Sequence, residues 1–149
     1  MLRPKRILVP TDFSEHSDRA LAQGLDIAKQ YKAELILLHV LPEDIYRSGL
    51  ELIFLEEKVR HEIRDRATDS AREGLQTQLD RFPQSREVEA DVHVRWGVPY
   101  DEILKEGEEQ EIDLIVIASL GRSNISKYLI GSVARNVLKG SKCPVLLTK

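Results

Sequence analysis

The sequence predicts an α/β fold: a three-layer, doubly wound domain built on a five-stranded parallel sheet. Five short apolar runs, several of them rich in branched residues, alternate with longer segments in which apolar residues recur every three or four positions. This alternation indicates βαβ crossovers, which make the connected strands parallel. With 149 residues, we expect one domain, 1–149, large enough to bury a core.

The first run predicts a strand over Arg6–Val9, which Pro10 ends because proline cannot donate a ladder hydrogen bond. Ser14 is then well placed to cap a helix that reaches about Lys32, with acidic residues in its first turn. Glu34–Val40 follows as the second strand. It is apolar on both faces, so we expect a central position in the sheet.

The longest segment, from Leu50 to about Leu79, predicts an amphipathic helix with one apolar stripe that steps by three or four residues. It follows a polar connector, Glu43–Gly49, and ends at Phe82-Pro83. Residues Val88–Arg95 alternate apolar and polar side chains. We therefore expect an edge strand with one face in water.

The last third predicts two helices and two strands. Pro99 suits the first position of a helix after a turn at Gly97, and Asp113 precedes the fourth strand. A final helix over 132–139, for which Ser132 is the expected cap, is followed by Gly140 and by the fifth strand, Val145–Thr148.

Two glycine-bearing turns indicate where a ligand binds. The apolar run from Ile115 ends in small residues and Gly121, and Gly131-Ser132 then opens the last helix. Glycine lets the backbone approach a ligand closely, and a helix N-terminus offers free N–H groups and partial positive charge. Together they suit a phosphate. The alternative is that Gly121 is only a turn residue and Ser132 only a cap.

The same turns resemble a known signature. Ala118-Ser119-Leu120-Gly121, nine residues, then Gly131-Ser132 is similar to the G-x-x-G, nine residues, G-[S/T] pattern of the universal stress proteins. Ile7–Asp12 and Cys143–Leu147 extend the resemblance to both ends of the chain. Ala118 departs from the pattern where the family has its first glycine, and Leu120 stands where many members have a polar residue.

The resemblance implies a Rossmann-like fold of the HUP (adenine nucleotide alpha hydrolase-like) type, with strand order 3-2-1-4-5. Ligands of open α/β sheets bind where the strand order reverses, here between the first and fourth strands. The resemblance further implies ATP or another adenine nucleotide, with Mg²⁺ held through the phosphates. The predicted nucleotide-binding residues are Pro10, Thr11, Asp12, Val40, Ile117, Ala118, Gly121, Gly131, Ser132 and Val133. Arg122 is added because it directly follows Gly121, where its charge could neutralise a phosphate.

Composition excludes several other functions. The net charge of −3 does not favour a nucleic acid as the main partner. No run has the ~18 apolar residues of a membrane span, and no signal peptide is recognisable, so we expect a cytoplasmic protein. The four histidines and the lone Cys143 lack metal-site spacing. P-loop, dinucleotide-fingerprint and nucleophile-elbow motifs are missing.

These observations predict a nucleotide-binding regulatory or protective module of the stress response, with no catalytic residues assigned. A slow ATPase or nucleotide-dependent transferase is the second hypothesis, although Asp12 is the one recognisable general base. A nucleotide-free, chaperone-like interaction protein is the third, and Ala118 favours it. Asp12 itself is either a ligand acceptor or a turn residue that caps the next helix. We also expect a homodimer through the apolar edge strand Val145–Thr148.

Overall fold

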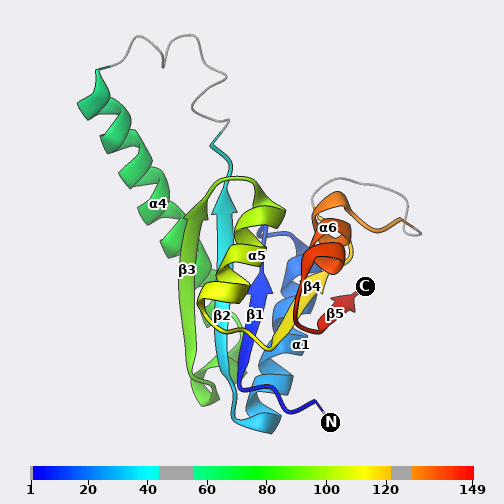
Figure 1. The fold of residues 1–149 in the computed structure, drawn as a ribbon. Helices are drawn as coiled ribbons and strands as arrows, with labels where there is room; N and C mark the ends of the chain where they lie inside the picture. The colour runs from blue at the N-terminus through cyan, green and yellow to red at the C-terminus, as the bar shows by residue number, and fades with distance from the viewer. Residues whose placement is uncertain (1, 44–55, 122–128) are drawn as a thin grey trace.

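The computed structural model describes residues 2–43, 56–121 and 129–149. Within them lies a parallel sheet of five strands in the order β3-β2-β1-β4-β5 (Figure 1). This confirms both the α/β class and the strand order that the family resemblance implies. The strands are β1 (Arg6–Pro10), β2 (Glu34–Leu41), β3 (Ala90–Trp96), β4 (Leu114–Ala118) and β5 (Val145–Thr148).

Helices cover both faces of the sheet. α1 and α4 pack on one face, and α5 and α6 on the other (Figure 1). Ser14 caps α1 as the sequence predicts, because its side chain accepts a hydrogen bond from the backbone N–H of Ser17. The helices are α1 (Glu15–Tyr31), α4 (Glu57–Asp80), α5 (Pro99–Glu109) and α6 (Ser132–Gly140), with a 3₁₀-helix, η1 (Pro83–Glu87), that the sequence does not predict.

Two apolar cores result from the alternation of side chains along the strands. Ile7 and Val9 of β1 join the core beneath α1 and α4, whereas Leu8 between them joins the core beneath α5 and α6. All three side chains are fully buried. The central strands are therefore apolar on both faces because each face is covered by helices.

The long helix is only partly packed. Among the described residues of α4, the buried ones are Ala71, Leu75, Gln78 and Leu79, all in its C-terminal half. Its N-terminal turns extend past the end of the sheet (Figure 1). The predicted start of this helix, Leu50, lies outside the described residues. Every helix in the described ranges is too short or too polar to cross a bilayer.

The expectation that one face of the third strand lies in water holds at the start of the strand, where the Asp91 side chain is 76% exposed, and fails towards its end, where α5 covers His93 and Arg95. Val92 and Val94 pack on the core beneath α1 and α4, as the alternation predicts. The opposite face is covered by α5, whose Glu102, Glu106 and Glu109 accept hydrogen bonds from Arg95. The pKa of Arg95 is raised above its ordinary value, chiefly by the hydrogen bond to Glu109, while burial opposes the shift. Charged side chains therefore line an interface between β3 and α5.

The predicted cap at Ser132 is also wrong. Gly131 occupies the N-cap position of α6, Ser132 is the first helical residue, and no side chain caps this end by a hydrogen bond. The first N–H groups of a helix have no partner within the helix. The N–H groups at the start of α6 are therefore available to an anion. A serine cap would have used one of them.

Candidate functional site

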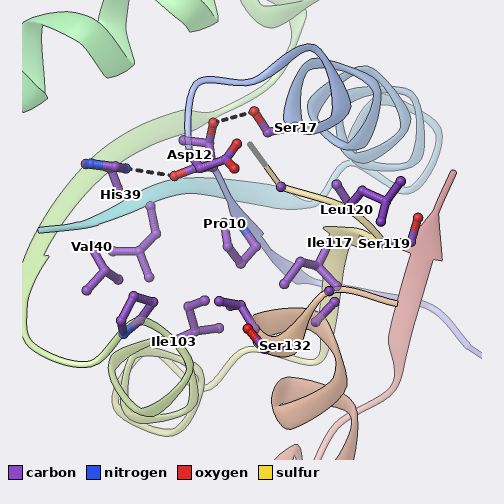
Figure 2. A pocket seen from close by; sticks show the side chains of 18 residues that line it. Pro10, Asp12, Ser17, His39, Val40, Ile103, Ile117, Ser119, Leu120 and Ser132 are labelled. Atoms are coloured by element: carbon purple, nitrogen blue, oxygen red, sulfur yellow. Dashed lines mark hydrogen bonds between the residues drawn. The ribbon is translucent and has the colours of Figure 1, made fainter. Parts of the chain in front are cut away.

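A cavity of about 270 Å³ lies at the carboxyl ends of β1 and β4, where the strand order reverses. This is the place where open α/β sheets bind ligands. Its walls come from the β1–α1 loop, the end of β2, the end of β4 with the following turn, and the starts of α5 and α6 (Figure 2). Segments more than a hundred residues apart in the chain thus form one site.

All the predicted nucleotide-binding residues line this cavity except Arg122, which lies outside the described residues. The cavity also has lining residues that the sequence analysis did not select. Pro99 and Ile103 belong to α5, whose position over the site depends on tertiary packing, and Ser17 and His39 had no motif to indicate them. The remaining such residues are Leu38, Ser119, Leu120 and Ala134.

One side of the cavity is apolar. Val40 at the end of β2, Ile117 in β4 and Ile103 on α5 project toward the same space (Figure 2), and each is less than a tenth exposed. Pro10 adds its ring from the end of β1. Buried branched side chains of this kind provide an apolar surface on which a flat heterocycle packs.

The opposite side consists of backbone turns. The N–H of Gly131 donates to the Ser119 carbonyl at 2.7 Å, which joins the turn after β4 to the start of α6. A Cβ on Gly131 would lie 3.3 Å from the Ser119 oxygen, and one on Gly121 would lie 2.8 Å from Asp12 Oδ2. Both glycines let neighbouring atoms approach the backbone closely, and neither has a left-handed backbone conformation.

Ala118 introduces no backbone strain. It is the last residue of β4, paired with Thr148 of β5, and it is not among the described non-glycine residues with positive φ. The first glycine of the signature is therefore not required here for its backbone freedom. What Ala118 changes is the presence of one methyl group at the cavity wall.

The β1–α1 loop is held by a dense set of hydrogen bonds. Asp12 Oδ1 accepts from the N–H of Ser14 at 3.0 Å. The N–H of Thr11 donates to the Leu38 carbonyl at 2.8 Å, and its own carbonyl lies 2.8 Å from His39 Nδ1. Because a carbonyl only accepts, Nδ1 of His39 bears the proton. The Thr11 hydroxyl also lies 2.8 Å from Ser17 Oγ, and the dashed lines that end at His39 and Ser17 in Figure 2 mark these two bonds.

The backbone and hydroxyl of Thr11 are therefore engaged within the protein, and its side chain is buried. Asp12 is the one acidic residue among the described residues that line the cavity, and they include no lysine or arginine. The described part of the chain contains no cluster of three or more His, Cys, Asp or Glu that would hold a metal ion. A metal at this site would need ligand atoms from the bound molecule.

Residues 4–149 match the family model of the universal stress protein family. The chain is 35% identical to universal stress protein MJ0577 of Methanocaldococcus jannaschii, over 97% of this chain and 94% of that protein. The solved structure of MJ0577 superposes with a TM-score of 0.78, covering 99% of this chain and 97% of the other at 32% identity.

Two further solved structures share the fold and contain nucleotides. A universal stress protein in complex with cAMP has a TM-score of 0.70 at 23% identity, covering 99% of this chain and 98% of that one. The universal stress protein of Archaeoglobus fulgidus in complex with dAMP has a TM-score of 0.61 at 21% identity, covering 99% of this chain and all of the other.

Proposed function

The chain belongs to the universal stress protein family, and we propose that its cavity binds an adenine nucleotide, ATP in the first instance. The observation on which the proposal depends is one cavity that combines an apolar wall with two glycine turns and the uncapped start of α6. The complexes of two relatives with cAMP and dAMP support this class of ligand.

Each part of the site has a role in this proposal. Val40, Ile103 and Ile117 pack against the adenine, since purine rings favour apolar contact over water. The phosphates lie against the start of α6, where the N–H groups of Ser132 and Val133 and the helix dipole stabilise negative charge. Gly121 and Gly131 leave room for the phosphates to reach that backbone.

Mg²⁺ fits the site only as a companion of the nucleotide. Asp12 provides one carboxylate, and the described residues offer no cluster that would hold the ion alone. Mg²⁺ prefers octahedral oxygen ligands and is often bound by one or two carboxylates together with substrate phosphates. Asp12 and the phosphate oxygens are thus the ligands expected of this chain. The protein then acts as a nucleotide-dependent regulatory or protective module in the cytoplasm, where ATP is supplied.

Titration calorimetry with Mg²⁺ and ATP tests the proposal. We expect heat of binding and a rise in melting temperature that grows with ATP concentration, because a ligand of the native state stabilises it. Gly131→Val fills the phosphate side and should abolish both signals. Gly107→Val is the matched control, because a Cβ there meets only Ile115 Cδ1, at 3.9 Å, away from the cavity. Absence of heat and of thermal shift in the wild type at millimolar ATP would refute the proposal.

We further propose that the protein forms a homodimer through β5. Among the described strands, β5 pairs with β4 alone and is one edge of the sheet. It contains no charged residue, and its Leu146 is 37% exposed. An apolar edge of this kind is a template for pairing with another strand. Antiparallel pairing with the same strand of a second copy, about a twofold axis, satisfies both edges.

A further inference from the structure

We propose that Gln78 of α4 is a positioning residue for the cavity: its buried amide holds the β1–α1 loop that contains Asp12, so that nucleotide binding and the packing of α4 are coupled. The inference rests on the proposed nucleotide site. It concerns a residue distant in sequence from every segment of the signature, on a helix that contributes no side chain to the cavity wall.

The orientation of the Gln78 amide follows from its neighbours. Gln78 is 2% exposed, although α4 is largely polar. Its Nε2 lies 2.8 Å from Asp18 Oδ1, and Arg81 donates to both oxygens of the same carboxylate at 3.0 and 3.2 Å. Because a carboxylate only accepts, the NH₂ group must face Asp18. The acceptor Oε1 therefore faces Thr11.

Thr11 connects this amide to the loop. Its hydroxyl lies 2.8 Å from Gln78 Oε1 and is the donor that this oxygen requires. The same hydroxyl oxygen accepts from the N–H of Phe13 at 3.0 Å. The hydroxyl has a single proton, for which Gln78 Oε1 and Ser17 Oγ, each 2.8 Å away, are both acceptors, and its lone pairs are left to accept from Phe13. Asp12 lies between the two residues that this hydroxyl joins, so its backbone position depends on Gln78.

Phe13 supplies a second, independent contact with α4. Its φ is 66°, in the left-handed region that bulky residues rarely occupy, so surrounding contacts must hold it there. Its ring lies against His39, with centroids 4.5 Å apart, and beside Gly74, where a Cβ would stand 3.4 Å from the ring. Gly74 and Gln78 are four residues apart and thus share one face of α4. This face of α4 therefore contacts the residues on both sides of Asp12: Gln78 bonds Thr11, and Gly74 lies beside the ring of Phe13.

The coupling follows from this geometry. If α4 or its amide is displaced, the Thr11 hydroxyl loses its bond to α4, although Ser17 Oγ remains as an acceptor, and Phe13 loses one of the contacts that hold its left-handed conformation. Apparent affinity falls in proportion to the fraction of molecules with the competent loop. By thermodynamic linkage, a nucleotide that requires this loop must equally stabilise the packing of α4.

The test compares Gln78→Leu with Gln76→Leu. Gln76 is an exposed glutamine on the same helix, and within the described residues its side chain bonds to Asp80 alone. We expect Gln78→Leu to raise the Kd for ATP with Mg²⁺ by about tenfold, which corresponds to a tenfold fall in the fraction of molecules whose β1–α1 loop is competent to bind. The Kd of Gln76→Leu should stay within about twofold of wild type. Leu25→Ala, a core truncation elsewhere on α1, controls for general destabilisation and should leave the Kd unchanged.

Two readouts separate positioning from simple loss of stability. Thr11→Val should weaken binding about as much as Gln78→Leu, and the double variant should be no weaker than either single one. Thr11→Ser, which keeps the hydroxyl, should retain the sensitivity to Gln78→Leu that Thr11→Val loses. These Thr11 variants also test the inference if Gln78→Leu does not fold. Hydrogen exchange should show that ATP slows exchange in the last two turns of α4 in the wild type and not in Gln78→Leu.

The outcomes distinguish this inference from the proposed function. A wild type that binds no nucleotide overturns both. A wild type that binds ATP while Gln78→Leu and Thr11→Val bind equally well overturns the role of Gln78 and leaves the nucleotide site standing. Additive effects in the double variant, or equal weakening by Leu25→Ala, would likewise overturn it.

Discussion

Replacing Arg95 with methionine should strongly destabilise the fold without touching the cavity. Arg95 projects from β3 toward α5, where it bonds Glu102 at 2.8 Å, Glu106 at 2.7 Å and Glu109 at 2.9 Å. Methionine keeps much of the aliphatic volume and removes the charge. Glu106, the most buried of the three carboxylates, then loses the cation that compensates its burial.

Glu106 dominates the magnitude. Its side chain is 3% exposed, and without Arg95 its remaining partner is His93. Glu109 is 59% exposed, so its ion pair is screened by water and contributes little. Breaking a buried ion pair on one side destabilises by about 3–5 kcal/mol. The Arg95 side chain is 20% exposed, so we take the lower end, about 3 kcal/mol. For a domain of this size that lowers Tm by about 6–12 °C.

Urea unfolding and calorimetry measure this loss. Arg72→Met is the matched control, because Arg72 forms one exposed pair with Asp69 and should change stability by less than about 0.5 kcal/mol. Arg95→Met with Glu106→Leu should recover part of the loss, since an apolar pair leaves no buried charge. If Arg95→Met proved as stable as Arg72→Met, the reasoning from burial would be refuted.

The loss should also depend on pH. Arg95 lowers the pKa of Glu109, first through its hydrogen bond and then through its charge. A depressed carboxyl pKa stabilises the fold above the ordinary Glu value of 4.5 and ceases to do so as pH falls through the folded-state pKa. The stability difference between wild type and Arg95→Met should therefore shrink by the small contribution of Glu109 on acidification below that value. The raised pKa of Arg95 stabilises the fold at every pH below the ordinary arginine value, so it adds no pH dependence to this comparison.

Two further substitutions test other parts of the structure. Leu146→Lys on β5 should convert the proposed dimer to a monomer in light scattering, because a charged side chain opposes edge pairing; a wild type that is monomeric at tens of micromolar would contradict the dimer. Lys32→Gly should stabilise the protein by about 0.5–1 kcal/mol in urea unfolding, because Lys32 ends α1 with φ 56° and ψ 41°, a left-handed conformation that glycine adopts without steric cost. Lys32→Ala should bring no such gain, and an equal gain would show that the backbone conformation is not the cause.

The sequence alone determined the elements and much of the site. Apart from the 3₁₀-helix η1, the helices and strands have a local signal in their own residues, such as the apolar run of β4 or the cap at Ser14. Such signals specify burial and element ends locally. The turns at Asp12, Gly121 and Gly131 are detectable because loops at strand ends expose backbone to a ligand. The family resemblance implied the strand order, which a local repeat does not encode.

Only the tertiary structure decided which elements face one another. The alternation in β3 indicates two different faces, but not that α5 would cover the polar one with glutamates. Ile103 of α5 lines the cavity. Gln78 bonds Thr11, which is 67 residues away in the chain. Gln78 occupies a position in the apolar repeat of a helix that otherwise appears ordinary. The reason is that periodicity specifies how deeply a side chain is buried, whereas the partner of a buried polar atom depends on contacts between distant segments, which form only when the helices pack on the sheet.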